Sequence, residues 1–223
     1  SRNRYGGDMS FTYAQLKTAI QDFSENTETS FVTNLPVFIR GAEERIFKLV
    51  DLENFRKNAT ATMTSGNQYL AMPTDFLAAF SLSITNSSAK EFLLIKDVNF
   101  LQEYWPTVAS TGVPKFYAVF DDSTFLIAPT PNANFAVEMH YYYRPASLTA
   151  GADGGTTWLS TNGPNALLYA SLVEAYIYMK GDAQLLATYE KRFEESLMRL
   201  KTYAEARENT DAYRKGLPSQ ERS

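Results

Sequence analysis

The apolar residues of this chain change their spacing twice along its length, and this change restricts the folds that the chain can adopt. In residues 12–55 and again in residues 164–207 they recur every three or four positions, as in amphipathic helices. In residues 56–144 they recur at every second position, as in strands with one buried face. The sequence therefore predicts helices at both ends of the chain and short strands between them.

Two helices are expected in the N-terminal segment, and two more after a glycine-rich stretch in residues 148–163. Because proline is tolerated only in the first turn of a helix, Pro36 predicts that the second helix begins between residues 30 and 36. The apolar face of this helix predicts that residues 43–45, Glu-Glu-Arg, point outward.

Antiparallel hairpins in mid-chain with helices at both ends indicate an α+β fold. Neither helix pair can bury its apolar face alone, so we expect the N- and C-terminal pairs to pack together as a four-helix bundle. The β region is then an insertion of five to six short antiparallel strands. The predicted parts are N-terminal helices (1–55), an inserted β domain (56–147), a glycine-rich loop (148–163), C-terminal helices (164–207) and an extended C-terminal tail (208–223).

Composition removes several classes of function. The chain has no Cys and a single His, His140, which excludes a disulfide framework, a zinc–thiolate site and a two-histidine metal site. His140 falls on the polar face of its predicted strand, which favours a surface position over that of a catalytic base. The net charge of −4 argues against a general nucleic-acid-binding protein, which carries a basic excess. We therefore expect no enzyme activity, no metal and no cofactor.

Aromatic residues make up 14% of the chain, mostly as 14 Tyr and 15 Phe, and such residues are enriched in cores and protein interfaces. Residues 207–223 contain few apolar side chains, so we expect another chain to hold this tail, with Tyr213 and Leu217 as anchors. No stretch approaches the roughly 20 apolar residues of a membrane span, and residues 1–10 lack the apolar core of a signal peptide. These features favour a protein that acts through contacts with other proteins rather than with a membrane.

Several short motifs occur in an order that is typical of one protein family. They are YAQL (13–16), FIRGAEERI (38–46), MPTDFL (72–77), GVPKFY (112–117), APTP (128–131), YYYRP (141–145), WL (158–159), LLYA (167–170) and EAY (174–176). In order and spacing they resemble the head-to-tail adaptor (connector) proteins of tailed bacteriophages, the group that includes proteins like tail tubular protein A. Met72 stands where the family usually has Leu, which is a mild departure.

The resemblance implies a structural virion protein with no catalytic residues. Such adaptors assemble as a dodecameric ring under the portal vertex, and genomic DNA passes through the lumen without specific binding. The implied partners are further copies of the chain, the portal protein and a tail nozzle or tube protein. The implied location is the neck of the virion at the portal vertex, after synthesis in the host cytoplasm, with a role in assembly and DNA ejection.

Two sets of contact residues follow as hypotheses. A C-terminal segment of such adaptors reaches the portal, which assigns portal binding to Tyr213, Arg214, Lys215 and Leu217. The glycine-rich loop and the β hairpins are expected to contact tail components or the next subunit. This second hypothesis names Gly154, Gly155, Trp158, Tyr142 and Arg144.

Two functions of other classes are alternatives at this point. The β region can instead bind carbohydrate, as a ligand-binding module of a virion or cell-surface protein, which requires Trp105 or Trp158 to be exposed in a groove. An enzyme that uses carboxylates, such as a virion lysin, requires two acidic side chains that face each other across a cleft. The spacing of the acidic residues suggests no such pair, because neighbouring acids on a helix point apart and Asp121–Asp122 falls in a predicted turn.

Overall fold

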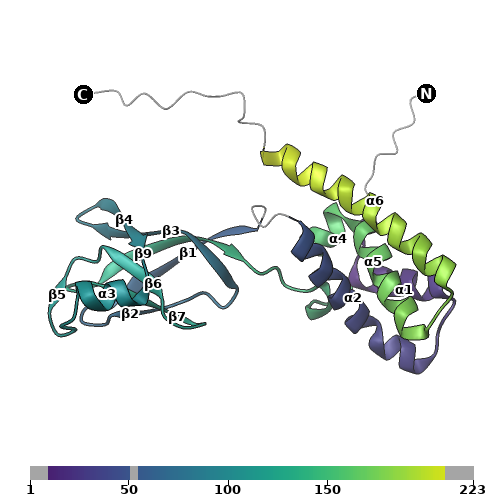
Figure 1. The fold of residues 1–223 in the computed structure, drawn as a ribbon, viewed down its shortest axis with the longest axis horizontal. Helices are drawn as coiled ribbons and strands as arrows, with labels where there is room; N and C mark the ends of the chain where they lie inside the picture. The colour runs from purple at the N-terminus through teal and green to yellow at the C-terminus, as the bar shows by residue number, and fades with distance from the viewer. Residues whose placement is uncertain (1–9, 51–54, 209–223) are drawn as a thin grey trace. The chain divides into compact units, whose positions relative to one another are not determined.

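The computed structural model of the chain describes residues 10–50 and 55–208. The chain divides into two compact units, one made of Ser1–Asp51 with Ala146–Ser223 and the other of Leu52–Pro145. The first unit is helical and the second is built mainly from strands (Figure 1). In sequence, the β unit is therefore inserted between two parts of the helical unit.

The helical unit is organised around one buried helix, α5. Its elements are α1 (Tyr13–Ser24), α2 (Thr29–Leu49), the 3₁₀ turn Leu148–Ala150, α4 (Trp158–Asn162), α5 (Pro164–Met179) and α6 (Ala183–Glu208). Helices α1, α2 and α6 all pack against α5 (Figure 1). A helix that is apolar on every side is buried on every side. The buried residues of α5 are accordingly Ala166, Leu167, Leu168, Ala170, Ser171, Leu172, Val173, Ala175 and Tyr176.

Helix α2 does not begin where its proline predicts. It starts at Thr29, so that Pro36 lies inside the helix instead of in its first turn. An internal proline costs about 3 kcal/mol, whereas burying one large apolar side chain contributes about 1.5–3 kcal/mol. Phe31 and Leu35 before the proline and Phe38 and Ile39 after it are all buried, so their combined burial outweighs the cost.

In the described residues, seven strands form one mixed sheet with the order β1-β9-β3-β4-β6-β7-β2. These strands are β1 (Arg56–Met63), β2 (Tyr69–Ala71), β3 (Phe76–Asn86), β4 (Ala89–Ile95), β6 (Phe116–Val119), β7 (Thr124–Ala128) and β9 (Phe135–Tyr143). Neighbours are antiparallel except for β4 and β6, which run parallel. Helix α3 (Val98–Tyr104) and the short pair β5 (Thr111–Gly112) and β8 (Thr130–Pro131) complete this unit.

The sheet has a core face and an outer face. On β9 the core face carries Phe135, Val137, Met139 and Tyr141, all buried, as the alternation of the sequence predicts. These residues join a core with partners such as Leu82, Ile84, Phe125 and Ile127. Helix α3 covers the outer face of β6 and β7, where Leu101 packs against Ala118, Leu126 and Ala128.

The predicted four-helix bundle with a small inserted β region is wrong. The structure is α+β, but its described residues form six α-helices and a large mixed sheet. In the helical unit, the other helices surround the buried α5 instead of sharing one core equally. In the β unit, the parallel pairing of β4 with β6 and the pairing of β3 with β9 build a sheet with a core of its own.

Within the described ranges, no helix combines the length and the apolar character needed to cross a bilayer.

Candidate interaction surfaces

The structure distributes the predicted contact residues over both units. Gly154, Gly155 and Trp158 belong to the helical unit, whereas Tyr142 and Arg144 belong to the β unit. The residues assigned to portal binding, Tyr213, Arg214, Lys215 and Leu217, lie outside the described residues. The predicted residues that the structure describes therefore fall in both units, and each unit is considered by itself.

The glycine-rich loop caps the first helix. The backbone N–H groups of Tyr13 and Ala14 donate to the carbonyls of Gly155 and Asp153, at 3.1 and 2.9 Å. The Lys17 ammonium also bonds to the Asp153 carboxylate at 2.7 Å. Since the first N–H groups of a helix have no partner within the helix, these carbonyls satisfy them. The loop is thus held in place by its own chain.

The predicted contact residues of the helical unit keep some exposed surface. Gly154 is exposed and Gly155 is half-buried. Trp158 is the first residue of α4 and packs against the helical core, but it is only partly buried. A role of these residues in contacts with other proteins stays a prediction.

Tyr142 belongs to an exposed cluster on the outer face of the sheet. Its ring lies edge-on to that of Phe80, with 6.1 Å between the ring centroids. The Arg56 guanidinium lies 5.2 Å from the Phe80 ring centre and 5.5 Å from that of Tyr142. Arg144 is exposed beyond the end of β9. Aromatic residues and arginine are among the residue types most enriched at protein interfaces.

A polar network lies on the same outer face. Glu138 accepts hydrogen bonds from Lys90 and from Asn58, and the bond from Lys90, followed by that from Asn58, lowers the pKa of Glu138. His140 lies beside Glu138 and within 3.3 Å of the Ser81 hydroxyl through Nδ1. His140 is half-buried on the outer face of β9, as the alternation of polar and apolar residues along this strand predicts. The network connects four neighbouring strands, β1, β9, β3 and β4, and gives the polar residues of this face partners within the sheet.

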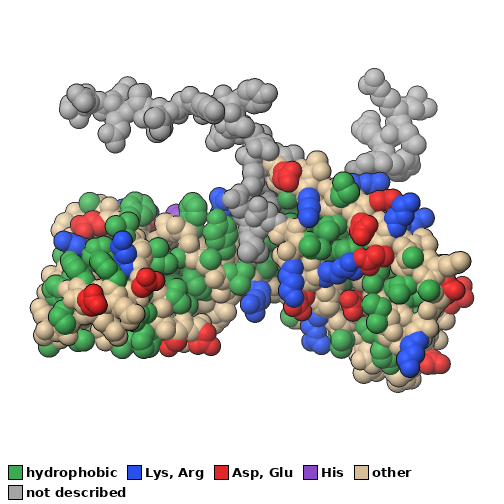
Figure 2. Space-filling model, viewed as in Figure 1, with side chains coloured by type: hydrophobic (Ala, Val, Ile, Leu, Met, Phe, Trp, Pro, Cys, Tyr) green, Lys and Arg blue, Asp and Glu red, His purple; other side chains and the backbone are tan. Residues whose placement is uncertain are grey.

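Sequence reasoning missed an exposed apolar strip that runs from β4 to α3. Phe92 and Leu94 point outward from β4 and are 64% and 60% exposed. Leu94 pairs in register with Phe116, whose ring contacts those of Phe100 and Tyr104, at centroid distances of 5.3 and 4.9 Å. We call these five residues the β4–α3 strip. Figure 2 shows hydrophobic side chains exposed on the visible face of the β unit.

The signal for this strip was present in the run Phe92-Leu93-Leu94-Ile95. Alternation predicts one apolar face per strand, whereas this run is apolar on both faces. Leu93 faces the core, so Phe92 and Leu94 must project to the other side. Contiguous apolar surface of this kind marks an interaction site.

Comparison with protein families identifies the type of protein. A family model described as SU10 adaptor protein, a family of phage head-to-tail adaptors, matches residues 11–216. The chain belongs to this family. The resemblance seen in the sequence is thereby confirmed, and the chain is a structural adaptor of a bacteriophage whose family places it at the junction of portal and tail. A search of curated proteins finds no match.

Two residues of the FIRGAEERI motif (38–46) have internal partners in the adaptor, which corrects the prediction that residues 43–45 all point outward; only Glu44 is exposed as predicted. Glu43 is buried, and its carboxylate accepts from the Leu148 N–H at 2.8 Å and from the Ser147 hydroxyl at 2.5 Å. Arg45 is half-buried and pairs with Glu190 of α6, and its hydrogen bonds lower the pKa of Glu190. The motif therefore joins α2 to two distant parts of the helical unit.

Asp75 of the MPTDFL motif (72–77) has a comparable role in the β unit. Its carboxylate accepts from the Lys57 ammonium at 2.6 Å and from the Tyr141 hydroxyl at 2.8 Å. Burial opposes ionisation of Asp75, but the bonds from Lys57 and Tyr141 outweigh it and lower the pKa of Asp75. Burial and the bond to Asp75 raise the pKa of Tyr141 to about 12. The motif thus fixes the turn before β3 to the neighbouring strands β1 and β9.

Replacing Tyr141 with phenylalanine should lower the free energy of unfolding of the β unit by about 1–2 kcal/mol at pH 7, because it removes a hydrogen bond to a carboxylate. Chemical denaturation followed by circular dichroism measures this change. Tyr143→Phe on the same strand is the control, and it should change the stability by less than about 0.5 kcal/mol. Equal effects of the two substitutions would show that the bond to Asp75 is unimportant.

In the part of the chain that the structure describes, no group of three His, Cys, Asp or Glu side chains has the arrangement of a metal site.

Proposed function

We propose that the adaptor assembles as a ring of twelve copies that joins the portal to a tail nozzle or tube protein. The observation that carries this proposal is the family match over residues 11–216, which gives the structural role. The β4–α3 strip of the β unit supports it, because contiguous exposed apolar surface is suited to a protein partner. The lumen of this ring is part of the channel for DNA ejection.

The contacts are assigned to three surfaces. The Tyr142 cluster with Arg144, and the loop that contains Gly154, Gly155 and Trp158, contact tail components or the next subunit. The C-terminal residues Tyr213, Arg214, Lys215 and Leu217 dock on the portal. These assignments give the aromatic excess of the chain a function in assembly rather than in catalysis.

A channel through which DNA passes requires that the adaptor does not bind the DNA phosphates strongly. Proteins that grip DNA do so mainly by neutralising phosphates with Lys and Arg. The adaptor carries 21 basic and 25 acidic residues, so its net charge is −4. This balance supports a channel through which DNA passes without specific binding.

Electron microscopy of the purified adaptor mixed with purified portal particles tests the ring. The expected result is a closed ring of adaptor copies coaxial with the portal. A monomeric adaptor that leaves portal particles unchanged would overturn the proposal.

A chain that ends at Arg207 should lose portal binding while its circular dichroism spectrum stays that of a folded protein. The proposal places the portal-binding residues after this point, whereas the cores of both units precede it. Co-sedimentation with portal particles measures the loss. A full-length variant with Tyr213→Ala and Leu217→Ala should show the same loss, and Ser219→Ala should bind normally. Unchanged portal binding by the truncated chain would refute this assignment.

A further inference from the structure

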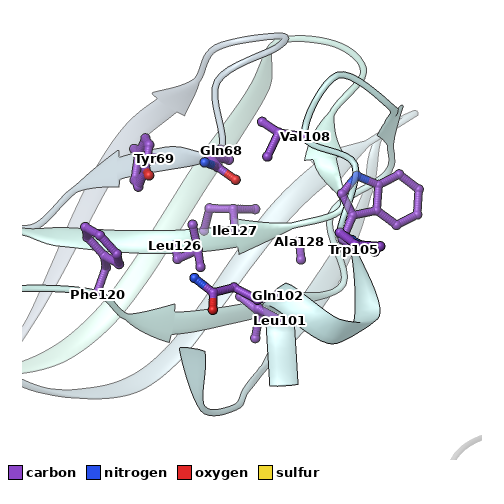
Figure 3. Close-up of a pocket in the computed structure, with 11 residues that line it drawn as sticks. Gln68, Tyr69, Leu101, Gln102, Trp105, Val108, Phe120, Leu126, Ile127 and Ala128 are labelled. Atoms are coloured by element: carbon purple, nitrogen blue, oxygen red, sulfur yellow. The ribbon is translucent and has the colours of Figure 1, made fainter. Parts of the chain in front are cut away.

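A shallow trough lies on the outer face of β7 in the β unit, with a cavity volume of about 330 Å³. Its floor is apolar and includes Leu126 and Ala128. Figure 3 shows Gln68 on one wall and Gln102 of α3 on the opposite wall, with Tyr69 and Phe120 at one end and Trp105 at the other. A cavity of this size is at the small end of the usual range for ligand sites, roughly 300–1,000 Å³.

The lining of the trough defines the chemistry of what it can hold. No charged side chain lines it among the described residues. The side-chain amides of Gln68 and Gln102 make no hydrogen bond to another described residue, so each offers a donor and an acceptor to a ligand. An occupant is therefore uncharged, has an apolar part for the floor and has polar groups that both donate and accept.

Two kinds of occupant have this chemistry, a neutral sugar and an extended peptide, and the aromatic geometry favours the peptide. A sugar stacks the C–H groups of its ring on the open face of an aromatic ring, but the rings of Tyr69 and Phe120 contact each other, with centroids 5.4 Å apart and planes tilted by 55°. The Trp105 indole N–H is already used, since it donates to the Ser110 carbonyl at 2.8 Å. A peptide group presents one donor and one acceptor, as a glutamine amide does.

The position of the trough in the sheet also favours an extended chain. Tyr69 is the first residue of β2, which is an edge strand of the sheet, and Gln68 directly precedes it. Edge strands offer backbone groups to a further strand, and neighbouring pockets take its side chains. One partner segment can thus use the strand edge and the trough together.

We propose that this trough binds an extended, uncharged segment of the tail protein. One apolar side chain of that segment lies over Leu126 and Ala128, and its backbone bonds to the amides of Gln68 and Gln102. This inference rests on the proposed adaptor function, because it names a further surface by which the adaptor recognises its tail partner.

A charge placed in the trough provides a matched test. Val108 lines the trough and is 46% exposed, whereas Val119 lies outside it and is 47% exposed. In portal–adaptor complexes titrated with the tail protein purified from the same virion, Val108→Lys should weaken tail binding at least about tenfold, because it buries a charge. Val119→Lys should change the binding less than about threefold. Equal effects of the two variants would overturn the inference.

The role of the two glutamine amides is tested in the same assay. Gln102→Ala removes one of the two free amides and should weaken tail binding about three- to tenfold. Asn99→Ala is the control, since Asn99 is an exposed amide on the same short helix but does not line the trough. Thermal unfolding of each variant checks that the β unit stays folded. Tail binding by Gln102→Ala that equals that of Asn99→Ala would contradict the assigned role of the amides.

A photo-crosslinker at position 108 in assembled virions identifies the occupant. A crosslink to an uncharged segment of a tail protein supports the inference. A crosslink to a second adaptor copy overturns it. It is also overturned if the adaptor binds a neutral oligosaccharide and Val108→Lys abolishes this binding while tail binding persists. Portal binding is measured in parallel. If the wild type does not bind the portal, the adaptor function itself is refuted. If the wild type binds the portal but the trough variants bind the tail protein normally, only this inference is refuted.

Discussion

Replacing Phe193 with alanine should lower the free energy of unfolding of the helical unit by about 3–5 kcal/mol, the usual cost of removing a buried phenylalanine. Phe193 lies on α6 and is one of the largest fully buried side chains of the adaptor. The Arg45 guanidinium of α2 lies 4.4 Å from the centre of its ring, so the ring also supports the Arg45–Glu190 pair. The substitution therefore leaves a cavity and removes the surface on which this ion pair rests.

The structure also predicts which part of the adaptor this substitution affects. The buried residues of the helical unit and those of the β unit form separate clusters. Differential scanning calorimetry of Phe193→Ala should show one transition at lower temperature and one unchanged. Phe125→Ala, which removes a fully buried phenylalanine of the β core, is the reciprocal control and should shift the other transition. If each substitution shifts the whole unfolding curve, the two units unfold together and the prediction is wrong.

The positions of such core residues could be predicted because they follow local periods. Phe193 falls in the helical stripe of the last helix, and the alternation on β9 assigns Tyr141 to the core and His140 to the outer face. The predicted turn at Asp121–Asp122 is also confirmed, since it joins the antiparallel strands β6 and β7. These signals need only neighbouring residues, which is why the sequence alone was sufficient.

The arrangement of the helices could not be predicted from the same signals. Leu168 and Leu172 recur at helical spacing, and this spacing by itself suggests one buried face, as in a bundle. Leu167 and Val173 on its other sides are buried as well, because three helices surround α5. Periodicity identifies an apolar face but does not limit burial to that face, and this is how the four-helix bundle was wrongly inferred.

The candidate surfaces depend on pairings between distant residues. The composition predicted aromatic interfaces, but Phe92 is exposed and Phe125 is buried only because of where each lies in the sheet. The parallel pairing of β4 with β6 brings Leu94 beside Phe116 and so completes the β4–α3 strip. No local pattern specifies such a pairing, because its partners are separated by a helix and a loop.

Glu43 is the residue for which local reasoning failed most clearly, and its replacement has the second large expected effect. The residue is only 4% exposed, and its carboxylate accepts hydrogen bonds from Ser147 and Leu148, more than 100 residues away in sequence. Glu43→Ala leaves the buried Leu148 N–H without an acceptor, which costs about 1–3 kcal/mol. We therefore expect a loss of about 2 kcal/mol in unfolding free energy at pH 7, measured by chemical denaturation. Glu43→Gln is the control, since its amide oxygen can still accept from Leu148, and it should retain most of this stability.

A comparison of Glu43→Gln with the wild type also shows how Glu43 responds to pH. Burial raises the pKa of Glu43 above its ordinary value of 4.5, against the lowering effect of the bonds from Ser147 and Leu148 and of the Arg40 charge. At a pH between 4.5 and the raised pKa, the folded adaptor holds a proton at Glu43 that the unfolded chain has lost. The contribution of Glu43 to stability is therefore full below this window and falls as the pH rises through it.

Carboxylates such as Asp75 and Glu190, whose pKa values are lowered, titrate with the opposite sign, so the wild-type curve alone does not isolate Glu43. The difference between Glu43→Gln and the wild type cancels these groups, which both proteins share. Relative to the wild type, Glu43→Gln should gain stability as the pH rises through the window, because glutamine never acquires the buried charge. A difference that does not change with pH would mean that the hydrogen bonds from Ser147 and Leu148 fully offset the burial of this carboxylate.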